Sequence, residues 1–257
     1  VNSALHLIDF FLLILSTLLI AAGGYVINDY YDIEVDRFNK PELLVVGKQL
    51  TTKNSLNYYW ILTIPGILIG FYLAYKVDYY LLGFIFPAVA IMLWSYSAKY
   101  QKTILLGNIM ISSLSALVIL VLWLFEFFAL KSELISFVEA MSKIKVLHII
   151  VIAYALFAFL VSLIREIVKD NEDIEGDREG GYKTFAIVFG KVYSRNVAVV
   201  LHVLSMGLLA LAMYLLYKNE LLMVFWYLTI AVQLLFFFVL YYLVTAKVNK
   251  DYRFLSN

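Results

Sequence analysis

The stretch FFLLILSTLLIAAGGYVINDYYDIEVD, residues 10–36, joins a long apolar run to four carboxylates. Residues 10–27 carry no charged side chain, and a run of about 20 apolar residues is enough to cross about 30 Å of hydrocarbon. Asp29, Asp32, Glu34 and Asp36 follow at once. Charged groups are costly in and near hydrocarbon, so the stretch predicts a membrane-spanning helix whose end carries acids for a specific purpose.

The composition of the rest of the chain agrees with a membrane protein. Of its 257 residues, 63% are apolar and only 15% are charged, and the mean hydropathy is +0.87. Soluble domains are about half apolar and about a quarter charged, so we expect an integral membrane protein. The net charge of +1 gives no indication of a nucleic-acid partner, and we expect none. The chain has no cysteine, which excludes disulfides, thiolate metal sites and cysteine nucleophiles.

The apolar runs predict an all-α, polytopic transmembrane helix bundle, because they lack the alternation of a membrane β-barrel. A short amphipathic segment at the membrane interface is expected over 129–145. Pro65, with Gly66 and Gly70 after it, indicates a kink or a close approach between helices. Seven spans are predicted, at about 7–28, 56–76, 79–97, 103–128, 146–167, 192–217 and 220–246.

The basic residues predict the orientation of these spans. If both acidic stretches described here lie on one side, that side holds 15 of the 20 Lys and Arg residues. Cytoplasmic segments are enriched in Lys and Arg, so we expect the acidic stretches to face the cytoplasm. The residues expected opposite are Lys76, Lys131, Lys143, Lys145 and Lys218.

A second acidic stretch, REIVKDNEDIEGDREGGYKT, occupies residues 165–184. In the first stretch, Asn28, Asp32 and Asp36 are spaced i, i+4, i+8, which stacks their side chains on one face of a helix. In the second, Asp173 and Asp177 repeat the i, i+4 step and Asp170 lies one turn earlier. Eleven of the 19 acidic residues fall within 28–36 and 166–179. Like charges at such spacing repel, so a compensating partner is expected.

A hard divalent cation is the partner that explains both clusters. Mg²⁺ prefers oxygen ligands and is usually held by one or two carboxylates together with substrate phosphates. Two clusters could therefore hold Mg²⁺ on either side of one diphosphate, with nearby cations taking the phosphate oxygens. We expect the metal ligands to be Asn28, Asp32, Asp36, Asp170, Asp173 and Asp177. We expect the diphosphate-binding cations to be Arg37, Lys99, Arg165 and Lys169.

Other readings of the acidic stretches remain open. They could be solvated, acid-rich loops balanced by neighbouring Arg and Lys. Acids in a membrane protein also mark ion pathways, so a divalent-cation transporter is an alternative from another class. A CDP-alcohol phosphotransferase would need a compact DG…AR…G…D…D pattern, which the sequence lacks. A purely structural membrane protein would leave the paired clusters unexplained.

The motifs resemble those of a known family. NDYYDIEVD (28–36) resembles the first motif of the UbiA superfamily of intramembrane prenyltransferases, and DNEDIEGD (170–177) resembles the second. The segment YSAKYQKTILLGN (96–108) between them also resembles a family feature. REIVKDNEDIEGD is most similar to the branch of digeranylgeranylglyceryl phosphate synthases. After the first motif, however, many members read Arg-Pro-Leu, where this chain has NKPELLVVGK (39–48).

The resemblance implies a fold and a reaction. The fold would be one domain over residues 1–257, with nine helices in the intact protein, so we expect one helix to be missing at each end. The reaction would be Mg²⁺-dependent transfer of a prenyl group, here geranylgeranyl, from its diphosphate to a lipid-soluble acceptor. That acceptor would be geranylgeranylglyceryl phosphate, or alternatively an aromatic acid or naphthoate of quinone biosynthesis.

The same reaction assigns roles to the candidate residues. Asp32, Asp36, Asp173 and Asp177 would be catalytic through the metal and the leaving diphosphate. Loss of diphosphate gives the prenyl carbon cationic character, which an aromatic face can stabilise in a dry cavity. Tyr96 and Tyr100 are the candidates for that role. The prenyl tail would lie among the apolar helices, in contact with the bilayer. No oligomeric state is predicted.

Overall fold

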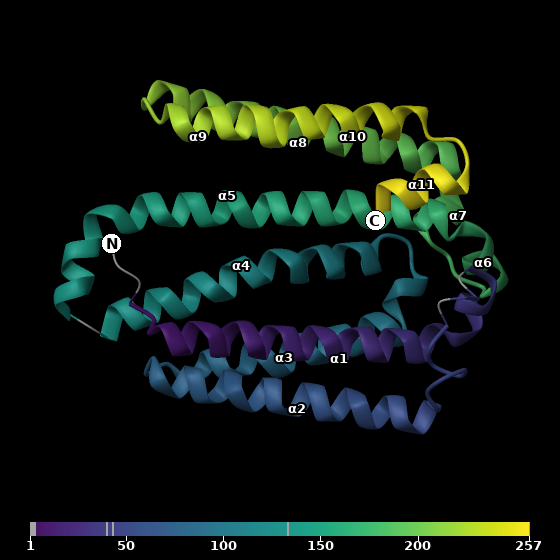
Figure 1. Cartoon of the computed structure of the whole chain (residues 1–257), viewed down its shortest axis with the longest axis horizontal. Helices are drawn as coiled ribbons and strands as arrows, with labels where there is room; N and C mark the ends of the chain where they lie inside the picture. The colour runs from purple at the N-terminus through teal and green to yellow at the C-terminus, as the bar shows by residue number, and fades with distance from the viewer. Residues whose placement is uncertain (1–3, 40, 43, 133, 257) are drawn as a thin grey trace. The chain divides into compact units, whose positions relative to one another are not determined.

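The chain is mainly helical in a computed structural model, which describes residues 4–39, 41–42, 44–132 and 134–256. In these ranges the only strand-like pairing is an isolated bridge between Val46 and Leu50. Figure 1 shows long helices running back and forth. The longer helices are α1 (Leu7–Asn39), α2 (Thr52–Lys76), α3 (Ile85–Ala98), α4 (Leu106–Ser132), α5 (Leu134–Glu172), α8 (Lys191–Lys218) and α10 (Leu234–Thr245).

Shorter helical segments connect the long ones. A 3₁₀ turn, η1 (Tyr80–Phe84), leads into α3, and η2 (Tyr100–Lys102) follows it. A π-helical segment, η3 (Leu228–Gln233), continues α9 into α10. The remaining short helices are α6 (Ile174–Glu179), α7 (Phe185–Phe189), α9 (Leu222–Tyr227) and α11 (Asn249–Ser256).

Seven helical segments are long and apolar enough to cross a membrane, which confirms the predicted number and order of spans. The interfacial segment expected over 129–145 stays a prediction. The residues concerned are the end of α4, to Ser132, and the start of α5, from Leu134, which precedes the apolar span that begins at Lys143. The spans are Leu7–Phe38, Thr52–Lys76, Tyr80–Ala98, Leu106–Ser132, Lys143–Glu172, Lys191–Lys218 and Leu222–Thr245.

The helices form two compact units, each with its own core. The first unit comprises Val1–Gln101 and Ser113–Leu156, and the second comprises Lys102–Ser112 and Phe157–Asn257. The first core is formed by side chains of α1, α2, η1, α3 and α4, such as Leu13, Leu73 and Phe125. The second is formed by α5, α8, α10 and α11, with Ile167 and Tyr252 among its buried residues.

Small residues allow α1, α2 and α3 to pack closely in the first unit. A Cβ at Gly66 would lie 2.7 Å from Ile20 Cγ1 and 3.0 Å from the carbonyl oxygen of Ser16. A Cβ at Gly70 would collide with the ring of Phe86. The Ser16 hydroxyl donates to the Gly66 carbonyl at 2.6 Å. The close helix approach predicted from Gly66 and Gly70 is therefore confirmed.

Candidate active site

The first acidic motif lies on the last turns of α1. Asn28, Asp32 and Asp36 are half-buried along one face, whereas Asp29 and Glu34 are exposed. An α-helix brings residues four apart onto the same side, so the predicted stacking is confirmed. Lys40, a basic residue that follows this stretch in the sequence, lies outside the described residues.

Gln101 connects the side chains of this motif. Asn28 Nδ2 donates to Asp32 Oδ2 at 2.7 Å and to Gln101 Oε1 at 2.8 Å. Gln101 Nε2 donates in turn to Asp32 Oδ1. The three side chains form a closed ring of hydrogen bonds, with η2 supplying the third member. Both bonds of Asn28 use its amide nitrogen, so its amide oxygen is a candidate metal ligand.

Two of the predicted cations, Arg37 and Lys99, belong to the first unit and have local contacts. Arg37 is exposed, and its Nη1 lies 4.0 Å from Glu34 Oε1 on the same helix. Lys99, just after α3, is also exposed, and its Nζ lies 5.4 Å from the centre of the Tyr100 ring. Tyr96 and Tyr100 are half-buried. These side chains can be reached by a ligand because they are not sealed in the core.

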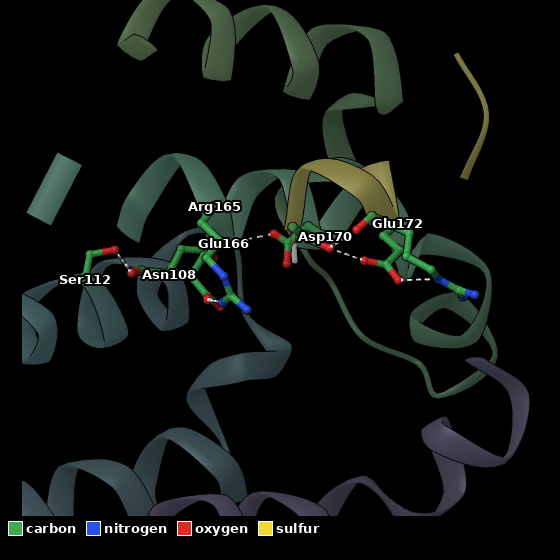
Figure 2. Close-up of polar contacts among 8 residues, drawn as sticks. Asn108, Ser112, Arg165, Glu166, Asp170 and Glu172 are labelled. Carbon is green, nitrogen blue, oxygen red and sulfur yellow. Dashed lines mark hydrogen bonds and ion pairs between the residues drawn. The ribbon is translucent and has the colours of Figure 1, made fainter. Parts of the chain in front are cut away.

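The second acidic motif lies where α5 ends, in the second unit. Asp170 accepts a hydrogen bond from the buried amide of Asn108 at 3.1 Å (Figure 2). Asn108 belongs to the first turn of α4, and its carbonyl accepts from Ser112 at 2.6 Å. This amide therefore fixes one acid of the motif against a neighbouring helix.

The stretch from Asp170 to Asp177 is not one continuous helix. This corrects the expectation that Asp170, Asp173 and Asp177 lie at successive turns of a single helix. α5 ends at Glu172 and α6 begins at Ile174, so Asp173 lies at the break. The amide of Asp177 still donates to the carbonyl of Asp173 at 3.0 Å. Asp173 is half-buried and Asp177 is 8% exposed. The acids are thus presented by a helix end and the short helix that follows.

Arg165 and Lys169 lie one turn apart near the end of α5, as predicted. Arg165 Nη1 forms an ion pair with the buried Glu166 at 3.0 Å, and its own side chain is 52% exposed (Figure 2). Such a half-exposed guanidinium keeps donors for an anionic ligand, since it has five N–H groups in all.

In the part of the chain that the structure describes, no cluster of three or more His, Asp or Glu side chains could hold a metal alone. Each motif contributes only a few carboxylate or amide oxygens. This donor set fits Mg²⁺, which commonly takes one or two protein carboxylates and completes its shell with water and phosphate oxygens.

Two further carboxylates lie away from the motifs and have structural partners. Asp9 in the first turn of α1 accepts from Lys76 Nζ at 2.8 and 2.9 Å. Glu126 on α4 accepts from the backbone amides of Ala4 and Leu5 at 2.7 and 3.1 Å. Both carboxylates join elements of the first unit, and neither is needed to explain a ligand site.

Comparison with known proteins then decides the family. The sequence profile of the UbiA prenyltransferase family matches residues 1–257. The chain belongs to this family. As a UbiA protein with seven apolar spans, it is a multi-pass integral membrane protein.

The curated relatives of this UbiA chain include several digeranylgeranylglyceryl phosphate synthases. The protein from Methanobrevibacter smithii is 29% identical over 78% of this chain and 65% of its own length. The protein from Saccharolobus solfataricus is 37% identical over 72% of this chain and 58% of its own length. The matched region of the chain thus spans about 58–65% of these relatives.

Two solved structures share the UbiA fold. A digeranylgeranylglyceryl phosphate synthase structure has a TM-score of 0.59 at 25% identity, covering 98% of this chain and 80% of the other. A UbiA homologue from Archaeoglobus fulgidus, bound to DMAPP and Mg²⁺, has a TM-score of 0.64 at 17% identity. The latter match covers 99% of this chain and 85% of the other, and it supports the fold alone.

Gln101 and Asn108 are the polar residues of the site that sequence reasoning did not select. Both lie in the segment 96–108 that resembles a family feature. Their partners are 62 to 73 residues away in the chain, so no local spacing marks them. The signal available was their position, since Gln101 is an uncharged amide in the segment that joins two spans and Asn108 is one in the first turn of the second of these spans.

Proposed function

We propose that this UbiA chain transfers a prenyl group from a polyprenyl diphosphate to a lipid-soluble acceptor and releases diphosphate. The proposed donor is geranylgeranyl diphosphate, and the proposed acceptor is geranylgeranylglyceryl phosphate. The observation that carries the proposal is the pair of acidic motifs, each at the carboxyl end of a spanning helix, α1 and α5. The digeranylgeranylglyceryl phosphate synthases among the relatives support the choice of acceptor.

In this proposal the acidic motifs bind Mg²⁺. Asn28, Asp32 and Asp36 are the ligands from α1, and the second set is Asp170, Asp173 and Asp177. When bound, Mg²⁺ supplies charge neutralisation of the diphosphate leaving group. Asn108 and Gln101 hold Asp170 and Asp32 in place, so the carboxylates need little rearrangement when the ligand arrives.

The cations and aromatic rings have separate tasks. Arg37, Lys99, Arg165 and Lys169 donate hydrogen bonds to phosphate oxygens, because charge-assisted bonds to phosphate are short and strong. Tyr96 and Tyr100 present π-faces to the prenyl carbon as its bond to the diphosphate breaks. The acceptor hydroxyl then forms the new C–O bond and loses its proton. The apolar helices hold the prenyl chains and exclude water.

The experiment that tests this function uses the purified protein in detergent. It would be incubated with geranylgeranyl diphosphate, Mg²⁺ and one acceptor at a time, and the products would be identified by mass spectrometry. The acceptors are geranylgeranylglyceryl phosphate, homogentisate, 4-hydroxybenzoate and dihydroxynaphthoate. We expect product with the glycerophosphate lipid, lost in EDTA.

The other outcomes decide between the alternatives. Product with an aromatic acceptor only would replace the proposed acceptor while keeping the prenyl transfer. A folded protein that binds Mg²⁺ but gives no product with any acceptor would contradict the proposed function. Mg²⁺ flux into proteoliposomes would then support the transporter reading.

A further inference from the structure

Glu172, the last residue of α5, is a buried carboxylate with two partners on a distant helix. Arg253 Nε donates to its Oε1 at 3.0 Å, and the Ser256 hydroxyl donates to its Oε2 at 2.6 Å. Both partners lie on α11, more than 80 residues along the chain. A buried charge is tolerated only when it is paired and hydrogen-bonded, so the position of Glu172 depends on α11.

α11 is itself fastened to the second unit. Tyr252 is 2% exposed and packs in the core formed with α5, α8 and α10. Lys191 Nζ lies 4.7 Å from the centre of the Tyr252 ring, and it also donates to Asn249 Oδ1. This short helix therefore has further contacts at Asn249 and Tyr252, which precede the two residues that bind Glu172.

An acid at the start of α11 closes its amino end. Asp251 Oδ2 accepts from the backbone amides of Lys247 and Val248 at 2.8 and 3.0 Å. These two hydrogen bonds hold the pKa of the Asp251 carboxyl below its ordinary value. An acid that satisfies amide groups at a helix start stabilises the helix. α11 is thus a capped helix rather than a frayed tail.

Glu172 does not share a face with the candidate metal ligand Asp170. Residues two apart on an α-helix are rotated by about 200°, since each residue adds about 100°. Asp170 turns to Asn108 on α4, and Glu172 turns to α11 (Figure 2). Glu172 is therefore suited to fixing the end of α5 rather than to binding the metal.

The end of α5 matters because the chain changes direction at the next residue. Asp173 has φ −90° and ψ 6° and precedes α6, which carries Asp177. The placement of both acids depends on where and how α5 stops. Displacing a catalytic group by about 1 Å can cost about 100-fold in rate.

We propose that α11 is a clamp on the second acidic motif, with Glu172 as a positioning residue for Asp173 and Asp177. Arg253 and Ser256 hold Glu172, and Glu172 holds the end of α5. The inference rests on the proposed function, because it assigns the clamp to the proposed metal–diphosphate site.

The first test measures the mobility of α11 and does not depend on enzymatic activity. The chain has no cysteine, so Lys250→Cys on the exposed side of α11 accepts a single nitroxide spin label. We expect a slow label in the otherwise unchanged protein and a faster one when Glu172→Gln or Arg253→Gln is added. Lys247→Gln is the matched control for Arg253→Gln, because it also removes one positive charge, at an exposed position beside α11. It should leave the label slow. Unchanged mobility in both variants would overturn the clamp.

A second test measures the affinity of the proposed site for a divalent cation. Binding of Mn²⁺ in the presence of inorganic diphosphate can be read from the signal of free Mn²⁺. Outer residues around a metal site typically change its affinity by about 10–100-fold. We expect the dissociation constant to rise about tenfold in Glu172→Gln and Arg253→Gln, with partial recovery in Arg253→Lys. Lys247→Gln should match the unchanged protein.

The outcomes separate the clamp from the function. If the unchanged protein binds Mn²⁺ with diphosphate but makes no prenylated product, the proposed function fails while the clamp is still measured. If the label becomes mobile but Mn²⁺ binding is unaffected, Glu172 is only a structural residue and the positioning role is overturned. Absence of Mn²⁺ binding in the unchanged protein would overturn both proposals.

Discussion

Gln101 is the residue with the most specific geometry around the first acidic motif. Its amide accepts from Asn28 and donates to Asp32, so it sets the rotamers of both side chains. A carboxylate that is already oriented loses less entropy when a metal binds. Gln101 therefore acts on the proposed metal site without being one of its predicted ligands.

We predict that Gln101→Ala raises the Mg²⁺ concentration needed for half-maximal prenyl transfer by about 10-fold, the lower end of typical second-sphere effects. The maximal rate should recover at high Mg²⁺, because the ligands themselves remain. Gln49→Ala, the same change at an exposed position, should leave the Mg²⁺ dependence as it was. A Mg²⁺ curve for Gln101→Ala that overlays the unchanged protein would contradict this role.

The two adjacent faces of α1 offer a paired test of the first motif. Asp32 is half-buried within the hydrogen-bonded ring, whereas Asp29 is exposed. Asp32→Asn removes a charge without changing the shape of the side chain. Residues around a metal site change activity by up to about 100-fold, and Asp32 is a proposed ligand itself, so we expect the rate of prenyl transfer to fall by at least about 100-fold. Asp29→Asn should cost far less. Equal losses in steady-state kinetics would mean that the acids act only through total charge.

At the scale of elements, one buried amide links α4 to α5. Asn108→Ala would leave the Asp170 carboxyl without its donor from α4. An unsatisfied buried polar group costs about 1–3 kcal/mol, and about 1 kcal/mol corresponds to about 2–4 °C in a chain of this size. We expect the Tm in detergent to fall by several degrees. Asn54→Ala, at an exposed position of α2, should not lower it.

The packing of α2 against its neighbours gives a second stability test. A methyl group at Gly70 would collide with the Phe86 ring, whereas at Gly207 on α8 it would meet nothing within 4 Å. Overpacking typically costs about 1–3 kcal/mol, so Gly70→Ala should lower the Tm. Gly207→Ala should leave it unchanged or raise it slightly, because alanine is the better helix former. Equal Tm values for the two variants would show that Phe86 moves aside freely.

How far the sequence predicts these elements depends on the range of the interaction. The seven spans and the stacking of Asn28, Asp32 and Asp36 follow from local periodicity, so they could be predicted. The break at Asp173 could not be predicted, because no local signal marks it and the partners of the preceding Glu172 lie on α11, more than 80 residues away. The link between Asn108 and Asp170 is hidden for the same reason, since amides carry no local signal of their partners.

At the scale of the whole molecule, the distribution of charge sets the proposed orientation. The acidic motifs lie at the carboxyl ends of spans that run in the same direction through the membrane, since α1 and α5 are separated by three further spans. Basic residues concentrate on that same side, with 15 of the 20 Lys and Arg. A cytoplasmic site would meet water-soluble Mg²⁺ and release diphosphate there, while the prenyl chains stay in the bilayer.

This orientation can be tested at the two ends of α8. Lys183 precedes the helix and Lys218 ends it, and both side chains are exposed. Its 28 residues at about 1.5 Å each exceed the hydrocarbon thickness of about 30 Å, so the two positions should lie on opposite sides. Since the chain has no cysteine, Lys183→Cys and Lys218→Cys each give one reactive thiol. We expect an impermeant maleimide to label Lys218→Cys on intact cells, and Lys183→Cys only after permeabilisation. The reverse pattern would place the acidic motifs outside, and labelling of both positions on intact cells would contradict the span itself.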